Sequence, residues 1–159
     1  MSESRYDTAQ VCMNGHSINP SSVKYPAHNQ DYCSKCGEKT IQKCQDCHSP
    51  IKGRLKESLS LRYVPPSYCH NCGNTYPWTQ SKLEAAKEFA DELDNINEEE
   101  KEKLKESLND LVREGPRTKL AETRFKKIMM KTGKESLDAM KSILIDIVSE
   151  TIKKSLFGQ

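Results

Sequence analysis

Long apolar runs are missing from this sequence. No window approaches the roughly 18 apolar residues that a transmembrane helix needs, so no membrane span is predicted. Residues 1–20 contain neither a basic start nor an apolar stretch, and no signal peptide is recognisable there. These two absences predict a cytoplasmic protein.

A strong excess of charge is missing as well. The 159 residues include 25 Lys and Arg against 23 Asp and Glu, a formal charge of +2. This balance gives no global indication of a nucleic-acid or membrane partner. Hydrophobic residues make up only 35% of the chain, below the roughly 45–50% usual for globular domains, although that figure also counts Gly. The core must therefore be modest, or something besides apolar side chains must support it.

Cysteine and histidine are absent from the second half of the chain. All seven Cys, all four His and six of the seven Pro lie in residues 1–80, and the composition changes sharply near residue 78. We therefore predict two domains, residues 1–80 and residues 81–159. The first has no Phe, and a segment so poor in apolar residues rarely folds without disulfides or metal. Its candidate core residues are Val11, Ile18, Val23, Ile41, Ile51, Leu55, Leu59, Leu61, Val64 and Trp78.

The cysteines follow the spacing of metal ligands. An odd number of them argues against a closed set of disulfides, and clustered thiols in a reducing compartment are more typical of metal sites. Three Cys-x2-Cys pairs match zinc knuckles, and a Cys-x3-His pair precedes them. Eight ligands complete two tetrahedral sites, so the sequence predicts two structural Zn²⁺ ions that also stabilise the fold. The ligand pairs are Cys12 and His16, Cys33 and Cys36, Cys44 and Cys47, and Cys69 and Cys72.

The four pairs can share the two ions in two ways. In the sequential arrangement, a tandem zinc ribbon, the first two pairs hold one ion and the last two hold the other. In a cross-braced arrangement the first and third pairs share an ion. We favour the sequential one, in which the loops inside the sites have 16 and 21 residues. His16 completes the first site in this interpretation; His48 and His70, beside other ligands, are alternatives to it, and His28 is a bystander.

Both predicted sites are saturated by protein ligands. A catalytic zinc instead keeps one coordination position open for water or substrate. No Ser-His-acid set, carboxylate dyad or phosphate-binding loop is visible in the sequence. We therefore expect a protein without enzymatic activity.

Residues 81–159 show a helical pattern of apolar residues, and about four helices are predicted. Ser81, with Glu84 in capping-box register, would begin the first helix, and Asn97 would cap the second, which ends before Gly115 and Pro116. The third helix covers about 118–131 and the last about 134–156. The expected fold is a small zinc-stabilised β domain followed by an all-α region. The expected apolar stripes are Leu83, Ala86, Phe89, Ala90, Leu93 and Ile96; Leu104, Leu108, Leu111 and Val112; Leu120, Ala121, Phe125, Ile128 and Met129; and Leu137, Met140, Ile143, Leu144, Ile147, Val148, Ile152 and Leu156.

Several blocks of the first half resemble a bacterial double-zinc-ribbon family of unknown function. The opening block, residues 6–16, reads YDTAQVCMNGH, and residues 32–37 and 68–73 both read Tyr-Cys-x2-Cys-Gly. Tyr-Pro-Trp-Thr follows at residues 76–79. The likeness covers most of residues 6–80. It implies a bacterial cytoplasmic protein with the metal ligands named above, and it supplies no activity.

The expected function is that of an adaptor or regulatory module that recognises a protein partner. Trp78, directly after the last knuckle, is a candidate partner contact, although capping the ribbon is the simpler role for it. The last helix could bind a partner or a second copy of the chain through its broad stripe, or it could be part of a helical bundle's core.

Nucleic-acid binding is the alternative function. Residues 1–80 have a formal charge of +3, which two zinc ions and seven thiolates together reduce to about zero, too little to neutralise phosphates. The third helix is more basic, with Arg124, Lys126 and Lys127 as candidate contacts. The simpler interpretation is a solvated face that balances the acidic residues 98–106.

Overall fold

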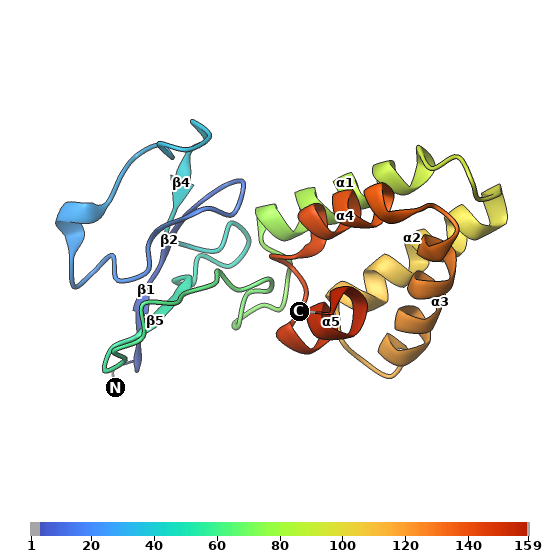
Figure 1. Cartoon of the computed structure of the whole chain (residues 1–159). Helices are drawn as coiled ribbons and strands as arrows, with labels where there is room; N and C mark the ends of the chain where they lie inside the picture. Colours follow the sequence, from blue (N-terminus) through green and yellow to red (C-terminus); the bar gives the residue numbers. More distant parts are fainter. Residues whose placement is uncertain (1–3, 159) are drawn as a thin grey trace. The chain divides into compact units, whose positions relative to one another are not determined.

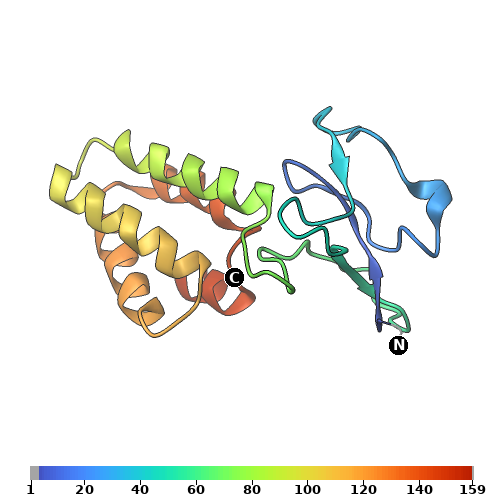
Figure 2. The ribbon, with the colours of Figure 1, turned by 180° about the vertical axis from the view of Figure 1, so that it is seen from behind.

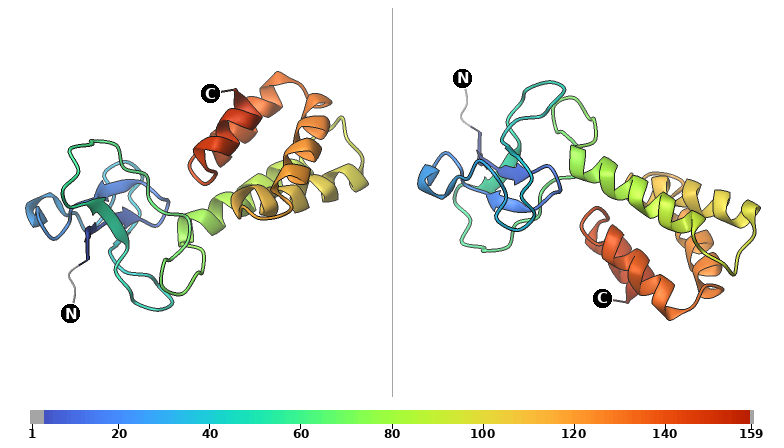
Figure 3. Two further views of the ribbon diagram at one scale, coloured as in Figure 1. Left: turned by 90° about the horizontal axis from the view of Figure 1, so that it is seen from below. Right: turned by 90° about the horizontal axis from the view of Figure 1, so that it is seen from above.

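The chain forms two compact units that divide between Gln80 and Ser81 (Figure 1). The structure, a computed structural model, describes residues 4–158. The first unit contains short β-strands and irregular loops. The second unit, over the residues described, contains only helices and their connections (Figure 3). The predicted fold class, a small β region followed by helices, is thus confirmed.

The strands of the first unit form two small antiparallel sheets. β2 is the central strand of one sheet, between β3 and β4, and β1 pairs with β5 in the other. Figure 2 shows short strands of this unit from behind, among longer loops. Each strand has four residues or fewer, so the ladders supply few backbone hydrogen bonds. The bounds are β1 Tyr6–Thr8, β2 Gln10–Cys12, β3 Ser17–Asn19, β4 Thr40–Ile41 and β5 Lys52–Leu55, with a 3-10 turn η1 at Pro26–His28.

Two buried polar side chains fix the long connection between β3 and β4. The carboxylate of Asp7 accepts hydrogen bonds from the backbone N–H of Val23 at 3.0 Å and of Lys24 at 3.2 Å. The amide of Gln10 donates to the carbonyl of Gln30 at 2.8 Å and accepts from its N–H at 2.9 Å. Hydrogen bonds from side chains therefore satisfy the backbone groups of this loop and hold it in place, as backbone hydrogen bonds between strands do in a longer β-ladder.

The core of the first unit gathers around cysteines of the last two knuckles. Its buried members are Ala9, Val11, Ile41, Cys44, Ile51, Cys69, Tyr76 and Trp78. Five apolar residues that the sequence suggested for this core are exposed instead. These are Val23, Leu55, Leu59, Leu61 and Val64. The last three lie in a loop without strand or helix, and such small sheets cannot cover it.

Trp78 belongs to this core. The indole is only 2% exposed, its ring stacks on that of Tyr76 with centroids 4.7 Å apart, and its N–H donates to the carbonyl of Pro66 at 3.0 Å. A buried indole whose donor is satisfied inside the protein has no free face for a partner. Trp78 is therefore a buried member of the core of the first unit, and its role in binding a partner stays a prediction.

The described residues of the second half form five helices, where about four were predicted. Their bounds are α1 Pro77–Asp91, α2 Glu98–Val112, α3 Thr118–Met130, α4 Lys134–Leu144 and α5 Glu150–Phe157. Helix α1 begins at Pro77, before the predicted start at Ser81, because the fixed φ of proline suits the first helical position. Asn97 caps α2 as expected and forms a full capping box with Glu100. No helix among the described residues is long and apolar enough to cross a membrane.

The predicted last helix is broken after Leu144. Ser149 begins α5 by accepting a hydrogen bond from the N–H of Ile152 at 3.3 Å. Ile147 and Val148, in the turn between α4 and α5, are both buried. The turn brings α5 into contact with α3, so that both halves of the long apolar stripe are covered within one small unit.

Most of the other predicted stripe positions are buried, and Leu120 is a clear exception. The four apolar residues of α2 have exposed fractions of 6% or less. On α3, Ala121, Phe125, Ile128 and Met129 are buried, whereas Leu120 is 41% exposed. Leu120 lies next to Ala121 along the helix, and a step of one residue turns a side chain by about 100° away from the core face.

Candidate metal centres

The three Cys-x2-Cys segments have the same backbone structure. In each, the N–H of the first cysteine donates to the carbonyl five residues later, at 2.8 or 2.9 Å. The N–H four residues after that cysteine donates back to its carbonyl, at 2.7 to 3.0 Å. This second donor has a positive φ: 78° for Gly37 and Gly73, and 63° for His48. Such a tight turn points two thiols at one position.

His48 occupies the left-handed position that glycine holds in the other two knuckles. A side chain there costs about 1–2 kcal/mol, whereas glycine adds about 0.5–1 kcal/mol of unfolded-state entropy. We expect His48→Gly to raise the free energy of unfolding by up to about 1 kcal/mol, measured by thermal or denaturant unfolding of the metal-loaded protein. His70→Gly is the matched control, because His70 is also exposed in a knuckle but has no positive φ, and it should give no gain.

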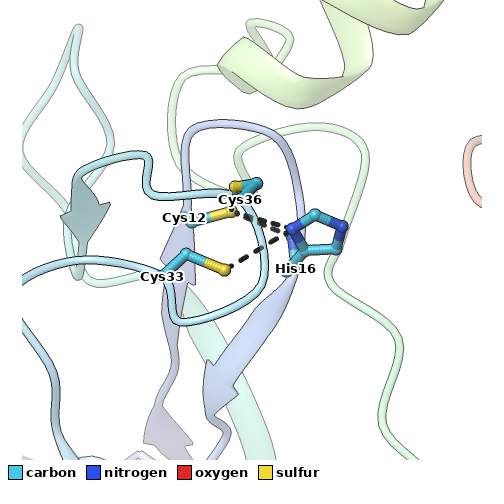
Figure 4. A group of neighbouring side chains, drawn as sticks. All are labelled: Cys12, His16, Cys33 and Cys36. Atoms are coloured by element: carbon cyan, nitrogen blue, oxygen red, sulfur yellow. Dashed lines mark hydrogen bonds between the residues drawn. The ribbon is translucent and has the colours of Figure 1, made fainter.

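Cys12, His16, Cys33 and Cys36 form the first tetrad (Figure 4). The Nδ1 atom of His16 lies 3.4 Å from the Sγ atom of Cys12 and 3.6 Å from that of Cys33. The sulfurs of Cys12 and Cys36 are 3.7 Å apart. A turn around Gly15, with φ of 92°, brings His16 back to Cys12. Of the described histidines, His16 alone joins a cysteine cluster.

Cys44, Cys47, Cys69 and Cys72 form the second tetrad. The sulfurs of Cys44 and Cys72 are 3.7 Å apart, and those of Cys47 and Cys69 are 3.6 Å apart. The grouping is therefore the sequential one, and the first and third pairs do not meet. In both tetrads two ligands are buried, one is half-buried and one is exposed.

These separations fit a shared cation. A tetrahedral site with metal–sulfur distances of about 2.3 Å needs sulfurs roughly 3.8 Å apart, and a nitrogen ligand roughly 3.5 Å from each sulfur. The ligand atoms of each tetrad all lie within 4.8 Å of one another. A disulfide needs about 2.05 Å, and all seven cysteines are free. The two Cys/His clusters resemble zinc ribbons and could each hold a metal ion.

The electrostatics of the second tetrad also favour a cation. The side-chain amide of Asn71 donates to Cys47 at 3.5 Å, and such hydrogen bonds lower the pKa of Cys47 to about 5. The backbone N–H of Asn74 lowers the pKa of Cys72, but burial and the neighbouring Cys44 outweigh it and raise that pKa to about 12. Some thiols of this tetrad thus lose their proton at a lower pH than others, and their negative charge disfavours ionisation of the remaining thiols. A divalent cation at the centre removes this conflict.

A comparable effect is present in the first tetrad. The backbone N–H of Glu38 lowers the pKa of Cys36 to about 6, whereas burial raises the pKa of Cys12. The lowered pKa favours the thiolate form of Cys36 at neutral pH, and a bound metal ion would favour the thiolate form of the buried Cys12 as well.

The buried hydroxyl of Tyr76 beside the second tetrad is compatible with a metal-bound thiolate there. The side chain of Tyr76 is 1% exposed, and its hydroxyl has no hydrogen-bond partner among the described residues. Burial raises its pKa, and so does interaction with Cys69. A buried donor without an acceptor is costly, and a metal-bound thiolate at Cys69 would supply the acceptor. The sequence analysis did not predict that Tyr76 and Asn71 lie against thiols of the second tetrad. Asn71 lies inside the last knuckle and Tyr76 follows it, and these positions could have indicated such contacts.

The other predicted site residues lie on α3. Lys126 and Lys127 are exposed and Arg124 is half-buried. Within residues 4–158, none of the three forms an ion pair, whereas Arg117, Lys119 and Lys131 pair with carboxylates. These three cations therefore remain available to a partner of opposite charge.

No curated protein and no solved structure matches the chain significantly. A family described as an uncharacterized protein conserved in bacteria (DUF2321) matches residues 5–156. That range includes both tetrads, helices α1 to α4 and all but the last residue of α5, and so extends beyond the resemblance found in residues 6–80. The chain therefore belongs to this bacterial family.

Proposed function

We propose that this protein is a non-enzymatic, zinc-stabilised adaptor or regulatory module of the bacterial cytoplasm that recognises a protein partner. The observation that carries the proposal is that each tetrad supplies four protein ligands in tetrahedral spacing. Such a site leaves no open position for water or substrate, which is the mark of structural zinc. The metal then stabilises a platform and takes no part in a reaction.

Zinc is favoured by the donor atoms. Three thiolates and an imidazole, as in the first tetrad, are a common structural zinc set, and four thiolates, as in the second, suit zinc or iron. The imidazole makes zinc the better assignment for the first site. The matching knuckle geometry of the second supports the same ion there.

Charge supports a protein partner over a nucleic acid. The helical half has 16 Lys and Arg against 17 Asp and Glu, and the first half is close to neutral once two zinc ions and seven thiolates are counted. Binding to nucleic acid depends on neutralising several phosphates. Neither half has the excess that this requires.

A second candidate function, nucleic-acid binding through α3, rests on one observation. Arg124 and Lys127, with Lys103 and Lys131, line a hollow of about 440 Å³ between α2 and α3. Lys103 and Lys131 pair with acids of α2, but Arg124 and Lys127 do not pair with any described residue. Two uncompensated cations in a hollow could hold a phosphate, although two contacts give little affinity at physiological salt.

Affinity capture tests the proposed function. The zinc-loaded full chain is used to retain components of its native lysate, with and without nuclease treatment. We expect a protein to be retained near equal stoichiometry in both samples. Nucleic acid retained before nuclease, with its associated proteins lost afterwards, would replace the proposal with the second candidate. In that case Arg124→Gln combined with Lys127→Gln should weaken retention and reduce its salt dependence.

A further inference from the structure

An apolar groove runs between α3, α4 and α5 in the helical unit. It has a volume of about 370 Å³. It is lined by Phe125, Lys126, Met129, Met130, Gly133, Lys134, Leu137 and Leu156. Ligand pockets usually measure about 300–1,000 Å³, so the groove has room for a few side chains of a peptide.

The groove has a buried floor and an exposed, adaptable edge. Phe125, Met129 and Leu156 have exposed fractions of 1%, 2% and 8% and form the floor. Met130 is 84% exposed, which is unusual for so large an apolar side chain. The unbranched thioether of methionine adjusts to varied shapes, which suits a surface that receives another protein's side chains.

The charged residues that line the groove have one sign, although Glu135 follows in the first turn of α4. Among the described residues that line the groove, the charged ones are Lys126 and Lys134, and none is acidic. Neither lysine forms an ion pair with any residue from 4 to 158. The N-terminus of α4 also lies at the groove, and its cap residue Gly133 has no side chain to accept from the first helical N–H groups. Both features favour an anionic group at the rim.

We propose that this groove binds an amphipathic segment of the protein partner whose apolar face is bordered by Asp or Glu. The proposal rests on the proposed function, since it specifies the partner's chemistry. The partner's apolar side chains occupy the floor against Phe125 and Met129, and its carboxylates meet Lys126 and Lys134. This is the helix-in-groove mode of recognition, in which apolar anchors supply affinity and border charges supply specificity.

The same observations disfavour a second copy of the chain as the occupant. A symmetric dimer through this groove would bring Lys126 and Lys134 of both copies to one apolar contact, and no acid of the groove would compensate them. A phosphate backbone is disfavoured as well, because the floor is apolar.

A peptide titration tests the groove directly. The probe is a fluorescein-labelled helical peptide of about four turns, with Leu on one face and Glu on the others; its counterpart has Lys in place of Glu. We expect saturable anisotropy with the acidic peptide at about 0.15 M salt and at least tenfold weaker binding of the basic one. Amide chemical shifts should change at the groove residues of the full-length, zinc-loaded protein.

Two pairs of variants locate the binding. Met130→Glu and Lys126→Glu should each weaken the acidic peptide about tenfold or more, and since both side chains are exposed, the fold should be unaffected. The matched controls are Leu120→Glu and Lys127→Glu, which change exposed residues of the same helix that do not line the groove. We expect these controls to alter affinity less than threefold.

Several results would overturn the proposal. Equal binding of both peptides, no saturable binding, or equal effects of Lys126→Glu and Lys127→Glu would remove the groove as an acidic-peptide site. A dimer seen by light scattering that Met130→Glu dissociates would make a second copy the occupant. If the partner captured from lysate binds the wild type and Met130→Glu equally, the proposed function stands and the groove does not.

Discussion

Cys72→Ser should release one of two metal ions and unfold most of the first unit, whereas Cys36→Ser should release the other ion with a smaller loss of structure. Both cysteines are the exposed ligand of their tetrad, which makes them a matched pair. The difference arises because Cys44 and Cys69 belong to the hydrophobic cluster that also contains Trp78, whereas the buried ligands of the first tetrad lie outside that cluster. Structural zinc contributes roughly 10–16 kcal/mol, comparable to the whole stability of a domain.

Metal analysis with circular dichroism and amide spectra measures this result. The wild type should hold two zinc ions per chain and each variant one. X-ray absorption at the zinc edge should show sulfur and nitrogen ligands only, and an oxygen ligand would contradict structural saturation. Equal unfolding by both variants would mean that the two sites stabilise the unit equally. Loss of the same ion in Cys12→Ala and Cys44→Ala would contradict the sequential grouping.

Gly53→Ala should destabilise the first unit by about 3 kcal/mol, at the upper end of the cost of adding a methyl group to a packed core. Gly53 lies in β5, where three backbone segments converge. A Cβ atom there would overlap the carbonyl oxygen of Pro20 and lie 2.7 Å from that of Asp7 and 2.9 Å from the amide nitrogen of Ala9. Backbone atoms cannot rotate away as the end of a flexible side chain can, so the strands themselves must move.

Thermal unfolding of the zinc-loaded protein checks this second result. Gly115→Ala is the control, since a Cβ atom at Gly115 meets nothing within 4 Å and its φ is not positive. We expect the control to change the free energy of unfolding by less than about 0.5 kcal/mol. A Gly53→Ala variant as stable as the wild type would show that the close approach of β5 to the other two segments is absent in solution.

Local patterns were enough to predict the knuckles and most of the helices. A Cys-x2-Cys turn depends on a few neighbouring hydrogen bonds, and the cap of α2 at Asn97 depends on Glu100 three residues later. Such features repeat wherever the local sequence repeats. The apolar stripe of α2 was also correct, because helical periodicity alone determines which residues share a face.

The features that the sequence did not predict are those of residues whose surroundings come from distant parts of the chain. Leu59 and Leu61 are apolar but exposed, since no strand or helix covers their loop. Asp7 and Gln10 are polar but buried, because they bond to backbone groups more than 15 residues away. Amino-acid composition does not predict which of these side chains are exposed and which are buried.

By itself the sequence determined which residues form the ligand pairs, that eight of them complete two tetrahedral sets, and where the helices of the second half would mostly form. Only the tertiary structure decided which pairs share a tetrad, that Trp78 is covered by Tyr76 and Pro66, and that the last apolar stripe breaks into α4 and α5. The physical reason is the separation along the chain between the residues that interact. Turns and helices depend on neighbours a few residues apart, whereas grouping, burial and grooves depend on contacts that spacing along the chain does not specify.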